Sequence, residues 1–142
     1  LKATVRDGNN NPMVGATVTF TTPATGASAT FGSLNTATAI TDSSGVATAP
    51  ALTANSTVGS YTVTAATTGI PVAATFNLSN VAGSPATITA TAGTPQSVGI
   101  NTVVATALQA TVRDAGSNPV AGVTVTFTAP ASGPSARFSG LS

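Results

Sequence analysis

The amino-acid sequence predicts an all-β protein built as a β-sandwich, and three observations support this prediction. Apolar residues alternate with threonine in segments such as "GATVTFTTP" at 15–23, which is typical of strands with one buried and one solvated face. Gly, Pro, Asn and Asp separate these segments at short intervals, as in sandwiches. No stretch of ten residues has the 3.6-residue apolar spacing of an amphipathic helix.

The alternation predicts the strands in chain order. They are expected at 1–7, 15–23, about 36–41, 46–52, 60–66, 72–79, 86–91, 104–113, 120–128 and 136–138. In each strand the apolar residues should face inward and the threonines outward, because β-branched side chains favour an extended backbone. The inward set is led by Ala3, Val5, Val18, Phe20, Val63, Phe76, Leu78, Ile88, Val123, Val125 and Phe127.

Turn chemistry separates the strands. Asp42 in "TDSSGVAT" can accept hydrogen bonds from the backbone two residues on, and Gly45 can adopt a positive φ. The segments "DGNNNP" and "DAGSNP" follow a strand with Asp7 and Pro12 in one case and Asp114 and Pro119 in the other. Turn capping is therefore the expected role of these aspartates.

The chain repeats itself. Residues 1–35 align without a gap to residues 108–142 at a constant offset of 107, and about 21 of the 35 pairs are identical. The rarer residues match too, as Arg6 does with Arg113 and Phe20 with Phe127. The sequence therefore predicts tandem repeats whose period equals this offset of 107, and the chain is a window of that array.

The repeat suggests a division into domains. Residues 1–82 are expected to form an immunoglobulin-like domain that lacks its own first strand, and residues 83–142 the first half, strands A–D, of the next repeat. A full period then has seven or eight strands, the immunoglobulin-like number. Tyr61 opens a strand after a bend, so it is either a tyrosine corner, whose hydroxyl bonds back to the main chain, or an ordinary core residue.

The motifs are familiar. "TVRDAGSNPVAGVTVTFTAP", "TDSSGVATAPALTANSTVGSYTVTA" and "PVAATFNLSN" resemble the bacterial immunoglobulin-like repeats of the intimin/invasin type. The resemblance covers nearly the whole chain, although its motifs are structural rather than chemical. It implies an extracellular stalk module that holds an adhesive tip away from the cell. It brings no receptor-binding residues, because that family places them in other, terminal domains.

The residue types leave little room for chemistry. The sequence contains no His, Cys or Glu and only three Asp, so a Ser-His-Asp or Cys-His arrangement cannot form and a zinc site has no ligands. We expect no catalytic residue, no cofactor and no metal site. A calcium site shared by Asp7 and Asp42 is the weaker alternative to turn capping.

Charge excludes further classes of partner. Charged residues make up 5% of the chain and its formal net charge is +1. Four scattered cations cannot displace the counterions of a nucleic acid, and hydroxyls interrupt every apolar run well before it could span a membrane. We therefore expect neither nucleic-acid binding nor membrane insertion. "NST" at Asn55 and "NLS" at Asn77 fit the acceptor pattern for N-glycosylation.

These observations predict a non-enzymatic structural spacer in a long extracellular or cell-surface protein. Its partners would be neighbouring repeats, and domains outside this window would contact a host or surface receptor. The first alternative is a segment of an extracellular filament whose repeats complete and pack on one another. A carbohydrate-binding module is a weaker alternative, since the aromatic residues fall on inward positions. An ice-binding surface of threonine rows is weaker still, since alternating threonine is ordinary on sandwiches.

Overall fold

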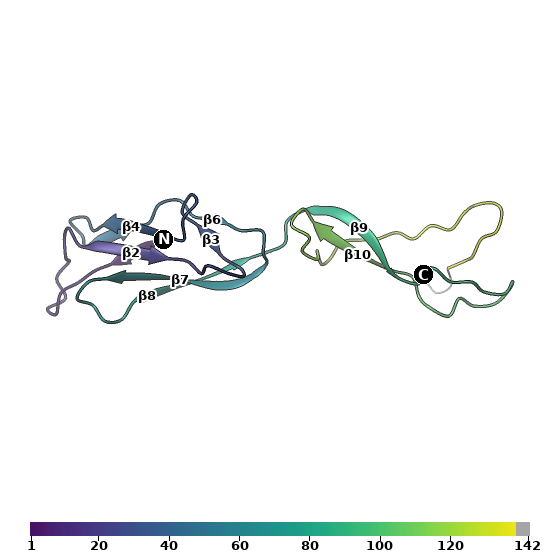
Figure 1. Ribbon diagram of the computed structural model, residues 1–142, viewed down its shortest axis with the longest axis horizontal. Helices are drawn as coiled ribbons and strands as arrows, with labels where there is room; N and C mark the ends of the chain where they lie inside the picture. The colour runs from purple at the N-terminus through teal and green to yellow at the C-terminus, as the bar shows by residue number, and fades with distance from the viewer. Residues whose placement is uncertain (139–142) are drawn as a thin grey trace. The chain divides into compact units, whose positions relative to one another are not determined.

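The computed structural model describes residues 1–138, and every regular element in that range is a β-strand (Figure 1). No described helix is long and apolar enough to cross a membrane. The contacts divide the chain into two compact units. Unit 1 comprises Leu1–Gly83 and Gly116–Asn118, and unit 2 comprises Ser84–Ala115 and the described residues from Pro119 onward.

Unit 1 is a two-layer sandwich (Figure 1). One layer is a four-stranded antiparallel sheet in the order β4-β2-β7-β8, formed by Thr36–Ile40, Thr17–Thr21, Gly59–Thr67 and Ala74–Asn80. The other layer contains two antiparallel pairs, β1 with β5 (Lys2–Thr4 and Val46–Thr48) and β3 with β6 (Ala29–Thr30 and Thr53–Ala54). Strands far apart in sequence therefore pair as the immunoglobulin-like prediction requires.

The predicted alternation is confirmed in unit 1. Along β2 the side chains of Val18 and Phe20 are buried and those of the flanking threonines Thr17 and Thr21 are exposed. The same holds along β1 and β7, whose inward residues join one core cluster drawn from both layers. The period of two thus places the apolar side chains between the layers and the hydroxyls outside.

Phe20 is the centre of this core. Its side chain is 0% exposed, and its ring centroid lies 6.5 Å from that of Phe31 in an edge-on arrangement and 6.3 Å from that of Phe76. These distances lie in the range at which aromatic pairs attract beyond their buried area. Phe31 follows β3 and Phe76 lies in β8, so the three rings connect the two layers.

The outer face of the four-stranded sheet carries hydroxyls in register. Thr21 of β2 pairs with Thr36 of β4 on one side and with Thr64 of β7 on the other, and Thr64 pairs with Thr75 of β8. Directly opposite residues in an antiparallel sheet point to the same side. A row of four threonines therefore crosses the sheet on the face away from the core.

Unit 2 contains one antiparallel pair, β9 (Pro85–Ala92) with β10 (Gln109–Asp114), with irregularities at both ends of β10. These strands agree with the predictions at 86–91 and, in part, 104–113. The predicted strands at 120–128 and 136–138 are wrong, because the structure forms no strand there. Ile88, predicted to face inward, is 58% exposed, and Val123 and Phe127 are exposed as well.

The strand predicted at 120–128 does not form because it has no neighbouring strand to pair with. In unit 1, β2 is held between β4 and β7. Adding the repeat offset to those two strands gives positions beyond number 142, so within this sequence the repeated segment has nothing equivalent to pair with. Without a ladder its backbone groups stay unpaired, and a two-stranded sheet alone cannot bury an apolar face.

Local geometry nevertheless recurs at the repeat offset. The Met13 N–H donates to the Val5 carbonyl at 3.0 Å, and the Val120 N–H donates to the Val112 carbonyl at 2.9 Å. The bridge between Arg6 and Pro12 recurs between Arg113 and Pro119, and the ring contact between Phe20 and Phe31 recurs between Phe127 and Phe138. The positive φ angles of Asn10 and Gly15 recur at Ser117 and Gly122. The tandem array and the division at residues 82 and 83 remain predictions.

We expect Phe20→Ala to destabilise the chain by about 3–5 kcal/mol, because it removes a fully buried ring and leaves a cavity between the layers. Ile40→Ala is the control, since this side chain in β4 is mostly exposed and should change the free energy of unfolding by less than about 0.5 kcal/mol. Urea unfolding monitored by circular dichroism measures both. Equal effects of the two substitutions would contradict the central place of Phe20.

Candidate functional site

Four of the predicted structural residues gather at one end of unit 1, where two turns meet. In the first turn the Asp7 carboxylate accepts hydrogen bonds from the backbone N–H of Asn9 at 2.9 Å and of Asn11 at 2.8 Å. The side-chain amide of Asn11 adds a third at 3.1 Å. An antiparallel bridge between Arg6 and Pro12 closes the loop. Asp7 thus caps the turn as its sequence predicts.

These hydrogen bonds act on the charge of Asp7. Three hydrogen bonds favour the ionised carboxylate and lower the pKa of Asp7 below its ordinary value. They come from the side-chain amide of Asn11, from the backbone N–H of Asn11 and, with a smaller effect, from the N–H of Asn9. Desolvation opposes them, but the carboxylate is exposed, so the lowering prevails.

The second turn is built on Asp42. Its carboxylate accepts hydrogen bonds from the backbone N–H of Ser44 at 2.8 Å and of Val46 at 3.0 Å. The Gly45 N–H donates to the Asp42 carbonyl at 2.9 Å, and Gly45 has a φ of 74°. This left-handed conformation is open to glycine at no steric cost, so the predicted roles of both residues agree with the geometry.

Gly45 also joins the two turns. Its carbonyl accepts a hydrogen bond from the Val5 N–H at 2.8 Å. A Cβ at position 45 would lie 2.7 Å from the Val5 carbonyl oxygen, 3.0 Å from the Cβ of Pro12 and 3.1 Å from the N of Met13. The close approach of the first turn therefore requires glycine here as much as the positive φ does.

Thr41 completes the junction, and the sequence analysis missed it. Its buried hydroxyl donates to the Met13 carbonyl at 2.6 Å and accepts from the Ala16 N–H at 2.8 Å. Its own carbonyl accepts from the Gly15 N–H at 3.0 Å. One signal was available: Thr41 lies two residues after Ala39 and four after Ala37, so the period of two places it on the inward side of this segment.

The equivalent positions in unit 2 are Asp114 and Pro119. Pro119 forms the bridge with Arg113, and Asp114 ends β10 and is buried, whereas Asp7 is exposed. The two aspartates are equivalent in sequence, so they belong to separate turns.

Tyr61 lies in β7, opposite Leu78 of β8, and packs half-buried against the core. Among the hydrogen bonds of residues 1–138, none involves its hydroxyl. Of the two roles that the sequence leaves open, the described contacts correspond to the core residue.

The two glycosylation candidates differ in how their side-chain amides are used. The Asn55 amide nitrogen donates to the Gly26 carbonyl at 2.8 Å, and its oxygen accepts from the Ser28 N–H and from the Asn80 amide. The Asn77 oxygen accepts from the Thr62 hydroxyl at 3.1 Å on the exposed face of β8. A sugar on Asn55 would therefore disturb an existing network, and a sugar on Asn77 would project into solvent.

Asn80, the last residue of β8, is the second residue that the sequence analysis missed. Its amide nitrogen donates to the Ser28 carbonyl at 2.9 Å, to the Asn55 amide oxygen at 3.0 Å and to the Thr57 carbonyl at 3.1 Å. It ties the end of the four-stranded sheet to the segments around β3 and β6 in the other layer. No local pattern marks it, because its partners lie far away in the sequence.

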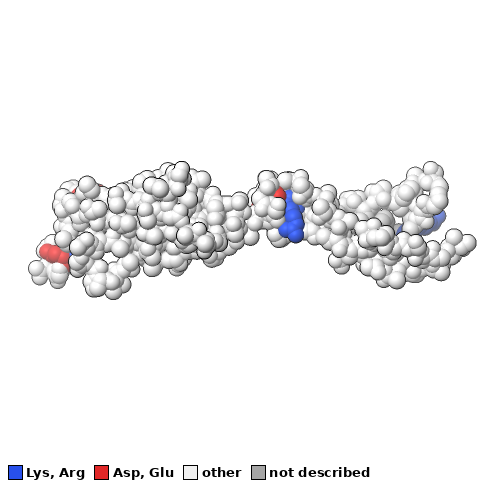
Figure 2. Space-filling model, viewed as in Figure 1, with Lys and Arg blue, Asp and Glu red and all other residues white. Residues whose placement is uncertain are grey.

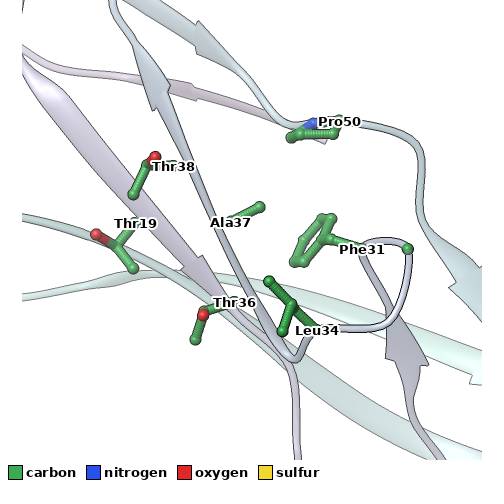
Figure 3. A pocket seen from close by; sticks show the side chains of 8 residues that line it. Thr19, Phe31, Leu34, Thr36, Ala37, Thr38 and Pro50 are labelled. Atoms are coloured by element: carbon green, nitrogen blue, oxygen red, sulfur yellow. The ribbon is translucent and has the colours of Figure 1, made fainter.

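An open groove of about 540 Å³ lies beside β4 (Figure 3). Its lining has apolar side chains and threonine hydroxyls and no charged group: Thr19, Phe31, Gly32, Leu34, Thr36, Ala37, Thr38 and Pro50. A sugar-binding site stacks its ligand on an exposed aromatic face, but Phe31 is only 7% exposed. The groove therefore offers no such platform.

The described residues hold few charges, as the visible face in Figure 2 shows. Within residues 1–138 no three His, Cys, Asp or Glu side chains gather in one place. The arrangement of Asp7, Asp42, Thr41 and Gly45 can fix two turns against each other, because each of these residues forms hydrogen bonds within the fold.

The lowered pKa of Asp7 predicts an acid-sensitive contribution to stability. A carboxyl whose pKa is lower in the folded than in the unfolded chain stabilises the fold above its unfolded value, and this contribution is lost as the pH falls through the folded value. We therefore expect the melting temperature of the wild type to fall below about pH 4 more steeply than that of Asp7→Asn. Parallel curves from pH 6 to pH 2 would contradict the role of this carboxylate.

Gly45→Ala should destabilise the chain more than Gly15→Ala. Both residues have a positive φ of similar size, but a Cβ at Gly15 meets no heavy atom within 4 Å. Gly15→Ala should therefore cost only the backbone strain, about 1–2 kcal/mol. Gly45→Ala adds a collision with backbone atoms, so we expect at least about 1 kcal/mol more. Chemical denaturation measures the difference, and equal losses would show that the turns do not depend on their close contact.

Comparison with known proteins shows similarity to a curated adhesin. Inverse autotransporter adhesin YeeJ of Escherichia coli (strain K12) is 35% identical to this chain over 127 residues, which is 89% of the chain. The chain spans only 5% of the length of that relative. No family model matches the sequence and no solved structure matches it.

The relationship agrees with the motifs and with the fold. The relative is an adhesin of the inverse autotransporter type, and the relationship indicates an extracellular location at the bacterial cell surface. The structure is all-β, with antiparallel sheets packed as a sandwich in unit 1. The chain therefore belongs to the bacterial immunoglobulin-like repeats of the intimin/invasin type.

Proposed function

We propose that this chain is a spacer in the stalk of a long surface adhesin and that it performs no catalysis. One observation supports this most directly: the region matched in the adhesin covers 89% of the length of this chain but only 5% of the length of the adhesin. A module that occupies so small a part of a long protein contributes chiefly to its length. Receptor binding would then belong to domains outside these residues.

The geometry of unit 1 supports the proposal. Three of its polar side chains form internal contacts, since the Asp7 and Asp42 carboxylates and the Asn80 amide all bond to the chain itself. Asn80 in particular ties the end of β8 to the opposite layer at the point where the chain leaves the sandwich. A spacer under tension needs such contacts, because peeling of a terminal strand would open its core.

The filament remains the second candidate, and exposed apolar side chains in unit 2 favour it. Ile100 and Val103 are 93% and 92% exposed, and Ile88 is more than half exposed. Soluble monomers tolerate isolated residues of this kind, but neighbouring repeats could cover a set of them. Electron microscopy of the native assembly separates the candidates, since a stalk gives separate beads and a filament gives a helical lattice.

The spacer role is tested in the full-length surface protein by removing one complete period of the repeat. We expect adhesion by the terminal domains to persist, while the distance between an epitope tag at the tip and the cell surface shortens. Duplicating the period should lengthen that distance. As a control, the purified chain described here should not compete with adhesion. Competition by the purified chain would show that it binds the receptor itself and would overturn the proposal.

A further inference from the structure

The strand β4 (Thr36–Ile40) forms one edge of the four-stranded sheet. Within residues 1–138 it pairs with β2 alone, so its other side is open. This edge is built from residues well inside unit 1. By the repeat offset β10 is equivalent to β1, so a strand equivalent to β9, which pairs with β10, belongs beside β1 in the other layer. Such a strand would leave the edge of β4 open.

The hydrogen bonds at the two ends of β4 show which of its backbone groups face the open side. Before the strand, the Asn35 carbonyl accepts from the Thr22 N–H at 2.8 Å, and after it the Thr41 N–H donates to the Ala16 carbonyl at 3.0 Å. Odd-numbered residues therefore direct their backbone groups toward β2, and consecutive residues of an antiparallel strand alternate in this respect. The N–H and C=O groups on the open side are those of the even-numbered residues, Thr36, Thr38 and Ile40.

The edge of β4 lacks the usual protection against pairing. Native proteins commonly blunt an open edge with a charge, a proline, a bulge or a very short strand. The strand β4 has five residues, none of them charged or proline, and its register with β2 runs without a shift. Its two alanines pack against the core, and its exposed side chains are two threonines and Ile40. The edge is therefore open to a second uncharged strand.

A second β4 fits this edge, because the strand is self-complementary. When two copies lie antiparallel with Ala37 opposite Ala37, Thr36 of each copy stands opposite Thr38 of the other. The backbone groups that meet are then those that face the open side in both copies. In the same register Leu34 lies opposite Ile40 of the second copy. These two side chains are 65% and 69% exposed in the single chain, so burying them against each other favours the pairing.

The groove beside β4 agrees with this register. Leu34, Thr36 and Thr38 line the groove. Opposite residues of an antiparallel pair point to the same face, so Ile40 of the second copy would lie on the face of the two threonines, next to Leu34. A shift of the pairing by two residues would instead place Leu34 opposite the charged Asp42. The side chains therefore favour the register centred on Ala37.

We propose that the open edge of β4 binds the β4 strand of a second copy of this chain, which joins two sheets across a two-fold axis. Each copy supplies the same edge and the same two apolar side chains, as in other isologous interfaces. Strands of this length bury a small area, so the contact is weak and a chain in dilute solution stays a monomer. Copies displayed together on a cell surface have a high effective concentration, which makes a weak contact sufficient. This inference goes beyond the spacer role and does not rest on it.

Disulfide trapping tests the register directly, because the chain has no cysteine. Full-length Thr36→Cys and Thr38→Cys variants, one of them carrying a mass tag, are mixed under mild oxidation. We expect a cross-linked heterodimer in excess of that given by Thr75→Cys with Thr38→Cys, since Thr75 is also exposed but lies in β8, at the other edge of the sheet. A yield no higher than this control would overturn the proposal.

Charged side chains on the edge give a second test with a matched control. Thr36→Lys/Thr38→Lys brings like charges together across the paired edges, and Thr36→Glu/Thr38→Glu does so with the opposite sign. Each double variant alone should stay monomeric, and a mixture of the two should associate at least about tenfold more tightly than either. The same charges at Thr62 and Thr75, on exposed positions of β7 and β8, are the control and should give no such gain.

Sedimentation equilibrium measures the association, and circular dichroism shows whether each variant is folded. The site would be refuted if the edge mixture associates no more tightly than its separate components, or no more tightly than the control mixture. Neither result bears on adhesion by other domains, so the spacer role is judged separately.

Discussion

The fold depends on one constraint: the chain must bury an apolar core with almost no charge and no covalent cross-link to help. Phe20, Val18 and Val63 satisfy it by packing between the two layers of unit 1, and Phe31 and Phe76 extend the contact to either side. Because burial is the main favourable term in folding, the rest of the structure serves to hold the strands where these side chains meet. The turns and the amide network have this purpose.

The polar contacts that hold the strands share one design. Asp7, Asp42, Thr41 and Asn80 each bond to backbone groups that no ladder satisfies, at the places where strands end. An unsatisfied backbone group costs more when it is buried than a new hydrogen bond contributes. A sandwich with many short strands has many such ends, so a few small polar side chains determine whether the layers close. The same reasoning explains why a sequence so rich in Thr, Ser and Asn can form one defined structure.

Much of this fold could be predicted from the sequence, and the limits have physical causes. Period-two alternation predicted β1, β2, β4, β5, β7 and β8 of unit 1, but it did not predict β3 and β6, which have two residues each and are too short to show a period. Asp-Gly chemistry predicted the turn at Asp42 because its bonds are local. Thr41 and Asn80 were missed because their partners are distant in sequence. The strand predicted at 120–128 failed for a related reason: alternation describes a strand's preference, but a ladder requires neighbours. Tyr61 shows the intermediate case, since its inward position follows from the pattern, whereas the pattern alone leaves open whether it is a core residue or a tyrosine corner.

The threonine row across β4, β2, β7 and β8 determines how this face of the sheet interacts with the solution outside the cell. Each hydroxyl both donates and accepts hydrogen bonds, so the face is wetted without any net field. Salt screens charges and leaves neutral dipoles largely unaffected. With no histidine or cysteine, the chain also lacks the side chains whose unperturbed pKa values lie closest to neutral pH. A surface of this kind therefore keeps the same character over a wide range of salt concentrations.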